Sequence, residues 1–232
     1  MIDEFFSEIA VPEFLKSEFE NEHWYLVIAR LKDILQDNIK SVQIESPVGN
    51  LIYHDKVHIG KNCKIGDNVV IDGPAYIGDD VEISTGAYIR AGSIIANGCS
   101  IGHAAEIKNV VMMEGSKIAN HVFLGDSILG VSARMGGHSE TANRLFEQSE
   151  ILFSYKEEKL STGLTKLGAI IGEGSRLGGG AFTYPGTMIG KNTFIATCVD
   201  IGGYVPANQF VQIKREYEFK INRFIGKLVS DK

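Results

Sequence analysis

The sequence predicts an all-β solenoid, a parallel β-helix of hexapeptide repeats. Isoleucine recurs at every sixth position, at Ile59, Ile65, Ile71, Ile77, Ile83, Ile89, Ile95, Ile101 and Ile107. A small or slim residue stands two positions before each of them, at Val57, Cys63, Val69, Ala75, Val81, Ala87, Ser93, Cys99 and Ala105. Residues two apart in a strand share a face, so each hexad predicts one short strand with two inward side chains and then a corner.

A spacing of six differs from the 3.6-residue period of a helix and from the alternation of a half-buried strand. Three hexads per turn would close a triangular prism whose isoleucines stack from coil to coil. Because the pattern continues without a break from Ile59 to Ile107, we expect this ladder to form the core.

The bulk composition argues against several function classes. The chain of 232 residues has a net charge of -6 and a pI near 5.6, whereas nucleic-acid-binding domains are usually basic. No apolar run approaches the length of a membrane span, and the start Met1-Ile2-Asp3-Glu4 lacks the features of a signal peptide. We therefore expect neither a nucleic-acid partner nor a membrane partner.

The three cysteines predict a reducing compartment. Cys63 and Cys99 occupy inward positions of the ladder, and Cys198 precedes Val199 in a later coil. Buried, reduced thiols of this kind are typical of the cytosol, so we expect a cytoplasmic protein.

Residues 1–41 lack the hexad and predict a helical N-terminal cap. Apolar residues recur with helical spacing between Asn21 and Ile39, after a shorter apolar turn that is interrupted at Pro12. An open end of a solenoid invites aggregation, so we expect this cap to cover one end of the coil.

The coil itself is predicted over 42–205, with one insertion. After Ile107 the spacing shortens by one residue at Met112, and it shortens again at Leu129. We interpret such slips as places where a corner moves outward, and hence as candidate site positions. The hexad is absent over about 138–166, a stretch too long for an ordinary loop, which we expect to be functional or to pack on a partner subunit.

Beyond the insertion the hexad returns and is followed by a second cap. The returning inward residues are Ile171, Leu177, Thr183, Ile189, Ile195 and Ile201. After Pro206, residues 206–232 predict a C-terminal helix over Lys214–Val229.

Several runs resemble known sugar-modifying enzymes. The run from Glu106 to Gly130 resembles the acetyltransferase half of bifunctional N-acetylglucosamine-1-phosphate uridyltransferase/glucosamine-1-phosphate acetyltransferase and the β-helical C-terminal halves of archaeal sugar-1-phosphate nucleotidylyltransferases. The pair Gly125-Asp126 and the run Lys166-Leu167-Gly168 are its most discriminating motifs. The resemblance covers roughly residues 50–205 and implies a left-handed coil, and the family's nucleotidyl-transferring half has no counterpart in this sequence.

The resemblance also implies a set of substrate-binding residues. Arg90 corresponds to a phosphate- or uridylyl-binding arginine, Lys108 to a sugar-phosphate lysine and Asn143 to an asparagine at the amino-sugar site. Arg90 and Lys108 each follow an inward isoleucine and lie one coil apart, so the two side chains could clamp one phosphate. The alternative for each is a solvated face of the coil.

Five further residues enter by the same resemblance. Phe123 stands where the family has a tyrosine, and Arg134 stands where the bacterial enzymes have an asparagine. Lys166 opens one of the matching motifs and is a candidate substrate contact. An acyl-CoA would lie along the later coils, near Gly179 and Thr197.

The catalytic base is where the sequence departs most from the family. Asn120 occupies the position of the family's general-base histidine, and an amide cannot accept a proton near neutral pH. His121 is the next residue. Either His121 takes over the role after a local slip, or acetyl transfer is lost or altered.

A column of histidines offers a metal-site hypothesis. His103, His121 and His138 recur about one coil apart, so stacked coils would place them in a column that resembles the histidine sites of the metal-bearing hexapeptide carbonic anhydrases. Their spacing lacks the close histidine pair of that family and no carboxylate partner is evident, so we expect exposed corner residues and no bound metal.

The favoured function is a CoA-dependent N-acyltransferase that uses acetyl-CoA. Its substrate would be an amino-sugar phosphate such as glucosamine 1-phosphate, or a nucleotide sugar, and the family resemblance implies a homotrimer with the site between subunits. The alternative is a non-catalytic sugar-nucleotide-binding or oligomerising module that has lost its base, which fits Asn120 and Phe123. A zinc-dependent, carbonic anhydrase-like protein is the third possibility.

Overall fold

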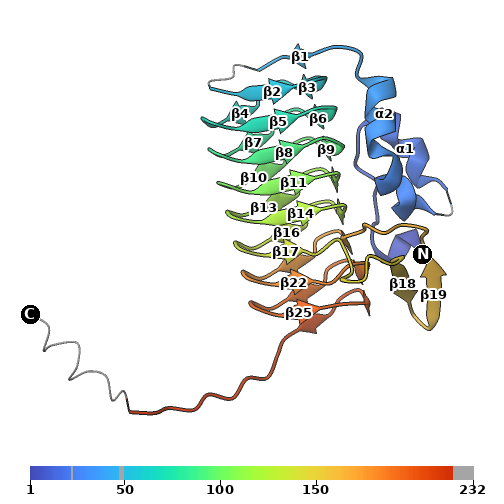
Figure 1. The fold of residues 1–232 in the computed structure, drawn as a ribbon, viewed down its shortest axis with the longest axis vertical. Helices are drawn as coiled ribbons and strands as arrows, with labels where there is room; N and C mark the ends of the chain where they lie inside the picture. The colour runs from blue at the N-terminus through green and yellow to red at the C-terminus, as the bar shows by residue number, and fades with distance from the viewer. Residues whose placement is uncertain (22, 47–49, 222–232) are drawn as a thin grey trace, which may run out of the picture.

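The fold is a left-handed parallel β-helix, a coil that the hexad predicts and whose hand the family resemblance implies. The computed structural model describes residues 1–21, 23–46 and 50–221, and Figure 1 shows the short strands stacked into a rod with helices along one flank. Three parallel sheets of nine, eight and eight strands run the length of this rod. We call them the helix-covered face, the groove face and the open face, and the chain visits them in that order.

The strands of each face are listed here in order along the rod. The helix-covered face contains β1 (Gln43–Ile44), β3 (Val57–Ile59), β6 (Ala75–Ile77), β9 (Ser93–Ile95), β12 (Val111–Met112), β15 (Ile128–Leu129), β20 (Ala169–Ile171), β23 (Thr187–Ile189) and β26 (Tyr204–Val205). The groove face contains β4 (Lys64–Ile65), β7 (Glu82–Ile83), β10 (Ser100–Ile101), β13 (Lys117–Ile118), β16 (Arg134–Met135), β21 (Arg176–Leu177), β24 (Phe194–Ile195) and β27 (Phe210–Val211). The open face contains β2 (Ile52–His54), β5 (Val70–Asp72), β8 (Tyr88–Arg90), β11 (Glu106–Lys108), β14 (Phe123–Gly125), β17 (Glu140–Thr141), β22 (Phe182–Thr183) and β25 (Asp200–Ile201).

The isoleucine ladder forms the core, as predicted. Ile59, Ile77 and Ile95 are register partners on successive strands of the helix-covered face, and each is fully buried. The residues two positions earlier also point inward. They are small because the narrow prism has room for only one large side chain per strand. Burying an isoleucine side chain stabilises the fold by about 1.5–3 kcal/mol, and the ladder repeats that gain on every coil.

The register slips shorten the coil and leave the stacking of the inward residues intact. Met112 pairs with Ile95, and Leu124 pairs with Ile107, so each inward residue keeps its place although the turn is one residue shorter. The missing residues fall between the open face and the helix-covered face, where Asn109 and Asp126 adopt positive φ angles of 54° and 46°. We call this corner, from Lys108–Asn109 through Asp126 to Gly168, the aspartate corner.

The N-terminal segment is helical, but it covers a face of the coil and not its end. It contains η1 (Ile2–Glu4), α1 (Glu13–Phe19), η2 (Trp24–Arg30) and α2 (Leu31–Asn38). Its apolar side chains, among them Phe5 and Trp24, form one buried cluster with the outward residues Ile94, Val111 and Ile128 of the helix-covered face. The reason is that this face carries apolar residues outside as well as inside, and they need a cover.

The insertion is ordered by the protein's own N-terminal segment. Glu140–Thr141 still belongs to the coil as β17, and β18 (Leu152–Tyr155) pairs with β19 (Glu158–Ser161) as an antiparallel hairpin. The Phe153 ring is buried against Tyr25, with ring centroids 4.7 Å apart and the planes perpendicular. Part of the insertion therefore packs within the chain, and a role of the remainder in function or in packing on a partner subunit stays a prediction.

The expected C-terminal helix does not begin where the sequence suggested. Residues 206–211 close one more turn with β27, and 212–221 form no regular secondary structure. The remainder of the predicted Lys214–Val229 helix, from residue 222 on, lies outside the described residues. None of the helices within the described ranges is long and apolar enough to cross a membrane.

Candidate functional site

The open face carries a row of polar side chains at the ends of its strands. Arg90 and Lys108 are register partners on β8 and β11, so the predicted stacking of these two cations is present. Asp72 lies one coil before Arg90, where the hydroxyl of Tyr88 and the Nδ1 of His54 both donate hydrogen bonds to its carboxylate. These bonds, chiefly that from Tyr88, hold the pKa of Asp72 below its usual range.

Both candidate phosphate-binding cations are held by carboxylates. Arg90 Nη1 lies 2.8 Å from Glu106 Oε1, a half-exposed ion pair on the surface of the sheet. Lys108 Nζ lies 3.3 Å from Asp126 Oδ2, and only 6% of the Asp126 side chain is exposed. The two cations therefore stand side by side but face different partners.

Asn143 joins Lys108 at the aspartate corner. Its Nδ2 donates a hydrogen bond of 2.6 Å to Asp126 Oδ2, the same oxygen that faces Lys108 Nζ. Asn109 Nδ2 donates to the other carboxylate oxygen over 2.9 Å. The ring of Phe123 lies beside Gly125, because a Cβ on that glycine would lie 2.7 Å from the end of the ring. Lys108, Phe123 and Asn143 thus gather around one corner.

Lys166 ends the insertion just outside this cluster. It is exposed and precedes Leu167, whose amide donates a hydrogen bond of 2.9 Å to the Asn143 carbonyl oxygen. Backbone contacts therefore bring the Lys166-Leu167-Gly168 run next to Asn143 and Asp126.

The three histidines form the column that their spacing predicts. They lie at the corner between the groove face and the open face, which we call the histidine corner. The rings of His121 and His138 are stacked 5.0 Å apart at 17°, and His103 meets His121 edge-on at 5.4 Å. All three are exposed, and His103 Nδ1 donates to the Thr85 carbonyl oxygen over 2.6 Å.

This column does not form a metal cage within the described part of the chain. There, no group of three or more His, Cys, Asp or Glu side chains could hold a metal ion. The absence of bound zinc remains a prediction.

Asn120 has a structural partner of its own. Its Oδ1 accepts a hydrogen bond of 2.9 Å from the backbone N–H of His103 on the preceding coil. The same device links coils at another corner, where Asn97 Oδ1 accepts from the N–H of Asp79. Asn120 therefore bridges neighbouring coils. Its amide cannot act as a general base.

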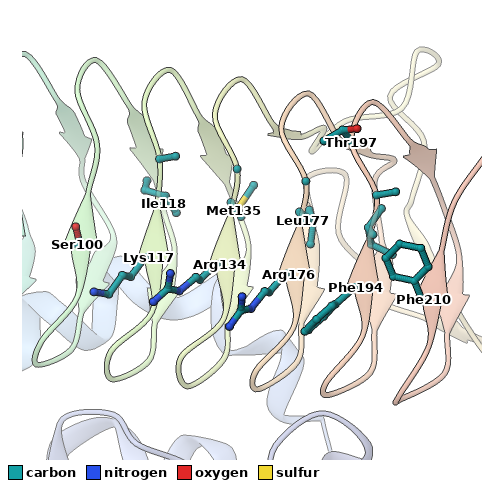
Figure 2. Close-up of a pocket in the computed structure, with 15 residues that line it drawn as sticks. Ser100, Lys117, Ile118, Arg134, Met135, Arg176, Leu177, Phe194, Thr197 and Phe210 are labelled. Carbon is teal, nitrogen blue, oxygen red and sulfur yellow. The ribbon is translucent and has the colours of Figure 1, made fainter.

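A groove of about 750 Å³ runs along the later strands of the groove face. Figure 2 shows Lys117, Arg134 and Arg176 projecting side by side from successive coils, followed by Phe194 and Phe210. The five are consecutive register partners from β13 to β27. The Arg176 guanidinium lies 5.3 Å from the centre of the Phe194 ring. The groove thus has a cationic stretch and an aromatic stretch along one line.

The groove extends to the histidine corner. Ala119, Gly136 and Gly178 line it at that edge, next to Asn120 and Gly179, and Thr197 lines it one coil further (Figure 2). Gly179 stacks closely on the coil before it, because a Cβ there would lie 3.2 Å from the Gly137 carbonyl oxygen. Both residues expected near an acyl-CoA therefore lie beside the groove or in its wall.

The predicted site residues divide between two faces of one chain. Arg134 lies on the groove face, apart from Arg90 and Lys108 on the open face. Its interpretation as part of the same sugar-binding cluster therefore does not hold within one subunit, because β16 and β11 belong to different sheets. His121 stands at the edge of the open face where β14 begins, whereas Asp126 follows its end.

Sequence reasoning missed several side chains that the fold brings to these surfaces. They are Asn109 at the aspartate corner, Glu106 beside Arg90, and Lys117, Arg176, Phe194 and Phe210 in the groove. The signal that could have found the groove is positional: each of its residues directly precedes an inward residue of the ladder. Asp126 itself stands in the Gly125-Asp126 motif, but no local pattern predicts its partners, because Lys108, Asn109 and Asn143 come from two neighbouring coils.

Known proteins resemble the chain over most of its length. A family model described as the GMPPB C-terminal domain matches residues 71–152. The chain is 38% identical over 198 residues to the protein named uncharacterized acetyltransferase YaiX of Escherichia coli O6:K15:H31, and the match covers 81% of this chain and 86% of that protein.

Two archaeal relatives are longer than this chain. Over 219 residues the chain is 33% identical to the bifunctional protein GlmU of Methanococcus aeolicus, a match that covers 82% of this chain and 53% of GlmU. Over 98 residues it is 36% identical to the bifunctional sugar-1-phosphate nucleotidylyltransferase/acetyltransferase of Sulfurisphaera tokodaii, covering 42% of this chain and 24% of that protein. The chain therefore spans about half the length of the GlmU relative.

Proposed function

Because the chain belongs to the hexapeptide-repeat β-helix acetyltransferases, we propose that it transfers an acetyl group from acetyl-CoA to an amino sugar. The acceptor would be an amino-sugar phosphate such as glucosamine 1-phosphate, or a nucleotide sugar. The name of the Sulfurisphaera relative, which includes a sugar 1-phosphate and an acetyltransferase, supports this substrate class. The proposal places the reaction in the cytoplasm, in keeping with three free cysteines.

One observation carries the proposal: the cationic groove extends to the corner that bears His121. Lys117, Arg134 and Arg176 offer charge for the phosphates of CoA, and Phe194 and Phe210 offer flat surfaces for its adenine. A thiol ester bound with its nucleotide along this groove can reach the histidine corner with its extended arm. Lys108 and Asn143 on the open face would bind the sugar phosphate.

In the proposed reaction the sugar amine attacks the thioester carbonyl carbon directly. The N–C bond forms and the C–S bond breaks, and CoA leaves as a thiolate. His121, in its neutral form, would take the proton released by the amine and return it to the thiolate. Backbone N–H groups of the coil would stabilise the developing oxyanion. Asn120 cannot take the proton, so the assignment of the base rests on His121.

The two binding surfaces lie on different faces of one chain, which favours an assembly. We propose a homotrimer in which the groove face of one subunit meets the open face of the next. Phe194 and Phe210 are exposed by 40% and 64% in the single chain, and a neighbour or a bound nucleotide would cover them. Light scattering at micromolar concentration should give the mass of three chains, and a stable monomer would overturn the assembly.

A non-catalytic binding module is the second candidate, favoured by the structural use of Asn120 as a bridge between coils. An assay of the purified full chain with acetyl-CoA and a panel of amino-sugar phosphates and nucleotide sugars distinguishes the enzyme from the binding module. Released CoA thiol and the mass of the acetylated sugar report transfer, and calorimetry reports binding. Transfer to one of these acceptors supports the enzyme; sugar-phosphate binding without thiol release supports the module.

A further inference from the structure

Asp126 is the one charged residue among the buried residues of the described chain, and it lies at the centre of the aspartate corner. Its two carboxylate oxygens accept from three side chains, Lys108, Asn109 and Asn143. Removing a carboxylate from water is costly unless donors replace the lost hydration, and here three side-chain nitrogens do so. The three donors hold this carboxylate in one fixed position.

The fold does not need a carboxylate at this corner. Gly92, Asn109 and Gly186 adopt positive φ without a charge where the chain passes from the open face to the helix-covered face, and the carboxylate of Asp55 at the same corner is exposed. A turn of this kind needs only a residue that tolerates the left-handed region. The negative charge of Asp126 therefore serves its side-chain partners and not the turn.

Those partners keep unused hydrogen-bonding capacity. An ammonium group has three donors, so Lys108 retains two that can face a ligand, and 21% of its side chain is exposed. Asn143 uses its Nδ2 toward Asp126, and its Oδ1 remains an acceptor for a sugar hydroxyl or amine. Oδ2 of Asp126 thus orients the Lys108 ammonium group toward a phosphate and the Asn143 amide oxygen toward the sugar.

We propose that Asp126 is a positioning residue that holds Lys108 and Asn143 in the orientation that binds a sugar phosphate. This inference rests on the proposed function and adds to it the residue that organises the acceptor side. Asn109 extends the network, because its Nδ2 also donates to the Ile28 carbonyl oxygen in η2 over 3.0 Å. The N-terminal segment is thereby connected to the acceptor site through a single side chain.

The test uses Asp126→Asn in the full chain, with Asp200→Asn as the matched control. Asp200 is an open-face carboxylate that accepts from Tyr184 over 2.9 Å and lies outside the corner. Calorimetry with glucosamine 1-phosphate should show affinity falling roughly 10- to 100-fold in Asp126→Asn and little change in the control. Acetyl-CoA affinity should be unchanged in both variants.

A second readout does not depend on any ligand. The rate at which an amine-specific reagent modifies Lys108, followed by mass spectrometry of its peptide, should rise several-fold in Asp126→Asn, because the ammonium loses its buried partner. In a Lys108→Met background, Asp126→Asn should weaken sugar-phosphate binding less than it does alone, because the two residues act as a unit.

The outcomes separate this inference from the proposed function. An unchanged labelling rate at Lys108 together with additive binding losses would overturn the positioning role, whatever the enzyme does. Faster labelling in Asp126→Asn, with a wild-type chain that binds no sugar phosphate, would support the positioning geometry and overturn the proposed acceptor. If Asp126→Asn fails to fold, Asn143→Ala and Lys108→Met must each weaken sugar-phosphate binding; full binding in both would overturn the inference.

Discussion

The amide of Gly168 donates a hydrogen bond of 2.8 Å to the carbonyl oxygen of Asp126, across the whole of the inserted hairpin. Beyond it, the Ala169 amide donates to the Ser127 hydroxyl over 2.9 Å, so the coil resumes in register where it was interrupted. The two sequence motifs that most resemble the sugar-modifying enzymes are therefore one structural unit. They close the insertion and form the aspartate corner together.

Gly168→Ala should strongly destabilise the protein. A Cβ at this position would lie 2.1 Å from the Gly125 carbonyl oxygen and 2.2 Å from the Ser127 hydroxyl, distances that force the backbone apart. We expect a loss of about 1–3 kcal/mol or more in the free energy of unfolding, measured by denaturant titration. Gly137→Ala is the control, since the nearest atom there is 3.4 Å away. Equal midpoints for the two variants would contradict the close approach.

Periodicity could predict the coil but not the corner chemistry. The ladder from Ile59 to Ile107 predicts strands, because inward residues must recur with the geometry of the prism. The slips at Met112 and Leu129 mark where turns are shortened. The hydrogen bonds from Asn109 and Asn143 to Asp126 depend on how three corners stack after an insertion, and no local pattern encodes that.

For the helices too, the sequence predicts the local structure but not the surface against which it packs. Helical spacing predicts that Trp24 belongs to a helical segment, and it does, in η2. Which surface that segment covers depends on outward residues such as Ile94 and Ile128, whose apolar character is visible only once the strands have been assigned to faces. The expectation of an end cap failed for this reason.

Glu4→Gln should change the acid stability of the fold. Tyr204 and the Ala207 amide donate to Glu4 Oε1 over 2.7 and 2.9 Å, and these bonds, first that from Tyr204, hold the pKa of Glu4 below its usual range. A carboxyl with a lowered folded-state pKa contributes stability above its unfolded pKa, which is lost as pH falls through the folded value. The variant should have a lower Tm at pH 6 and a smaller further loss on acidification.

A Tm series from pH 7 to pH 3 measures this difference, with Glu8→Gln as an exposed control from the same segment. If Glu4→Gln and wild type lose the same number of degrees on acidification, the anchoring of the N-terminal segment on the last coils does not depend on this carboxylate.

Thiol reactivity should separate the three cysteines. Burial raises the pKa of Cys99 to about 11, and it also raises the pKa of Cys63, whereas Cys198 is exposed. Because the thiolate is the reactive form, a disulfide reagent at pH 8 should modify Cys198 rapidly and the other two only on unfolding. Cys198→Ser should remove the fast phase. Fast modification of Cys99 in the native protein would contradict the closed interior of the coil.

Arg134→Ala and Arg176→Ala should weaken binding of acetyl-CoA if the groove holds its phosphates. Each guanidinium would make charge-assisted hydrogen bonds, so a loss of roughly 10- to 100-fold in affinity is expected, larger at low salt than at high salt. Lys64→Ala is the control, because Lys64 projects from the same face several coils earlier and is paired with Glu82 at 2.5 Å. Calorimetry with CoA measures all three. Full affinity in both arginine variants would show that the acyl donor does not bind in this groove.

The last prediction concerns His121, on which the proposed chemistry depends. The amine must attack unprotonated and lose a proton as it does so, and an imidazole is the side chain suited to accept that proton near neutral pH. His121 lies at the histidine corner, between the groove face and the open face, and has its ring exposed between those of His103 and His138. His121→Ala should therefore lower kcat by about 10²–10⁴-fold. Its Tm should change little, because the ring is on the surface.

Two variants make this assignment decisive. His103→Ala removes a ring from the same column but leaves His121 in place, so it should retain most of the turnover. Asn120→His restores the family's base, and if the wild type is inactive this variant should gain acetyl transfer. Turnover that is unaffected by His121→Ala would show that another group accepts the proton. An inactive wild type that Asn120→His activates would mean that the binding module is the native function and that the lost base is the reason.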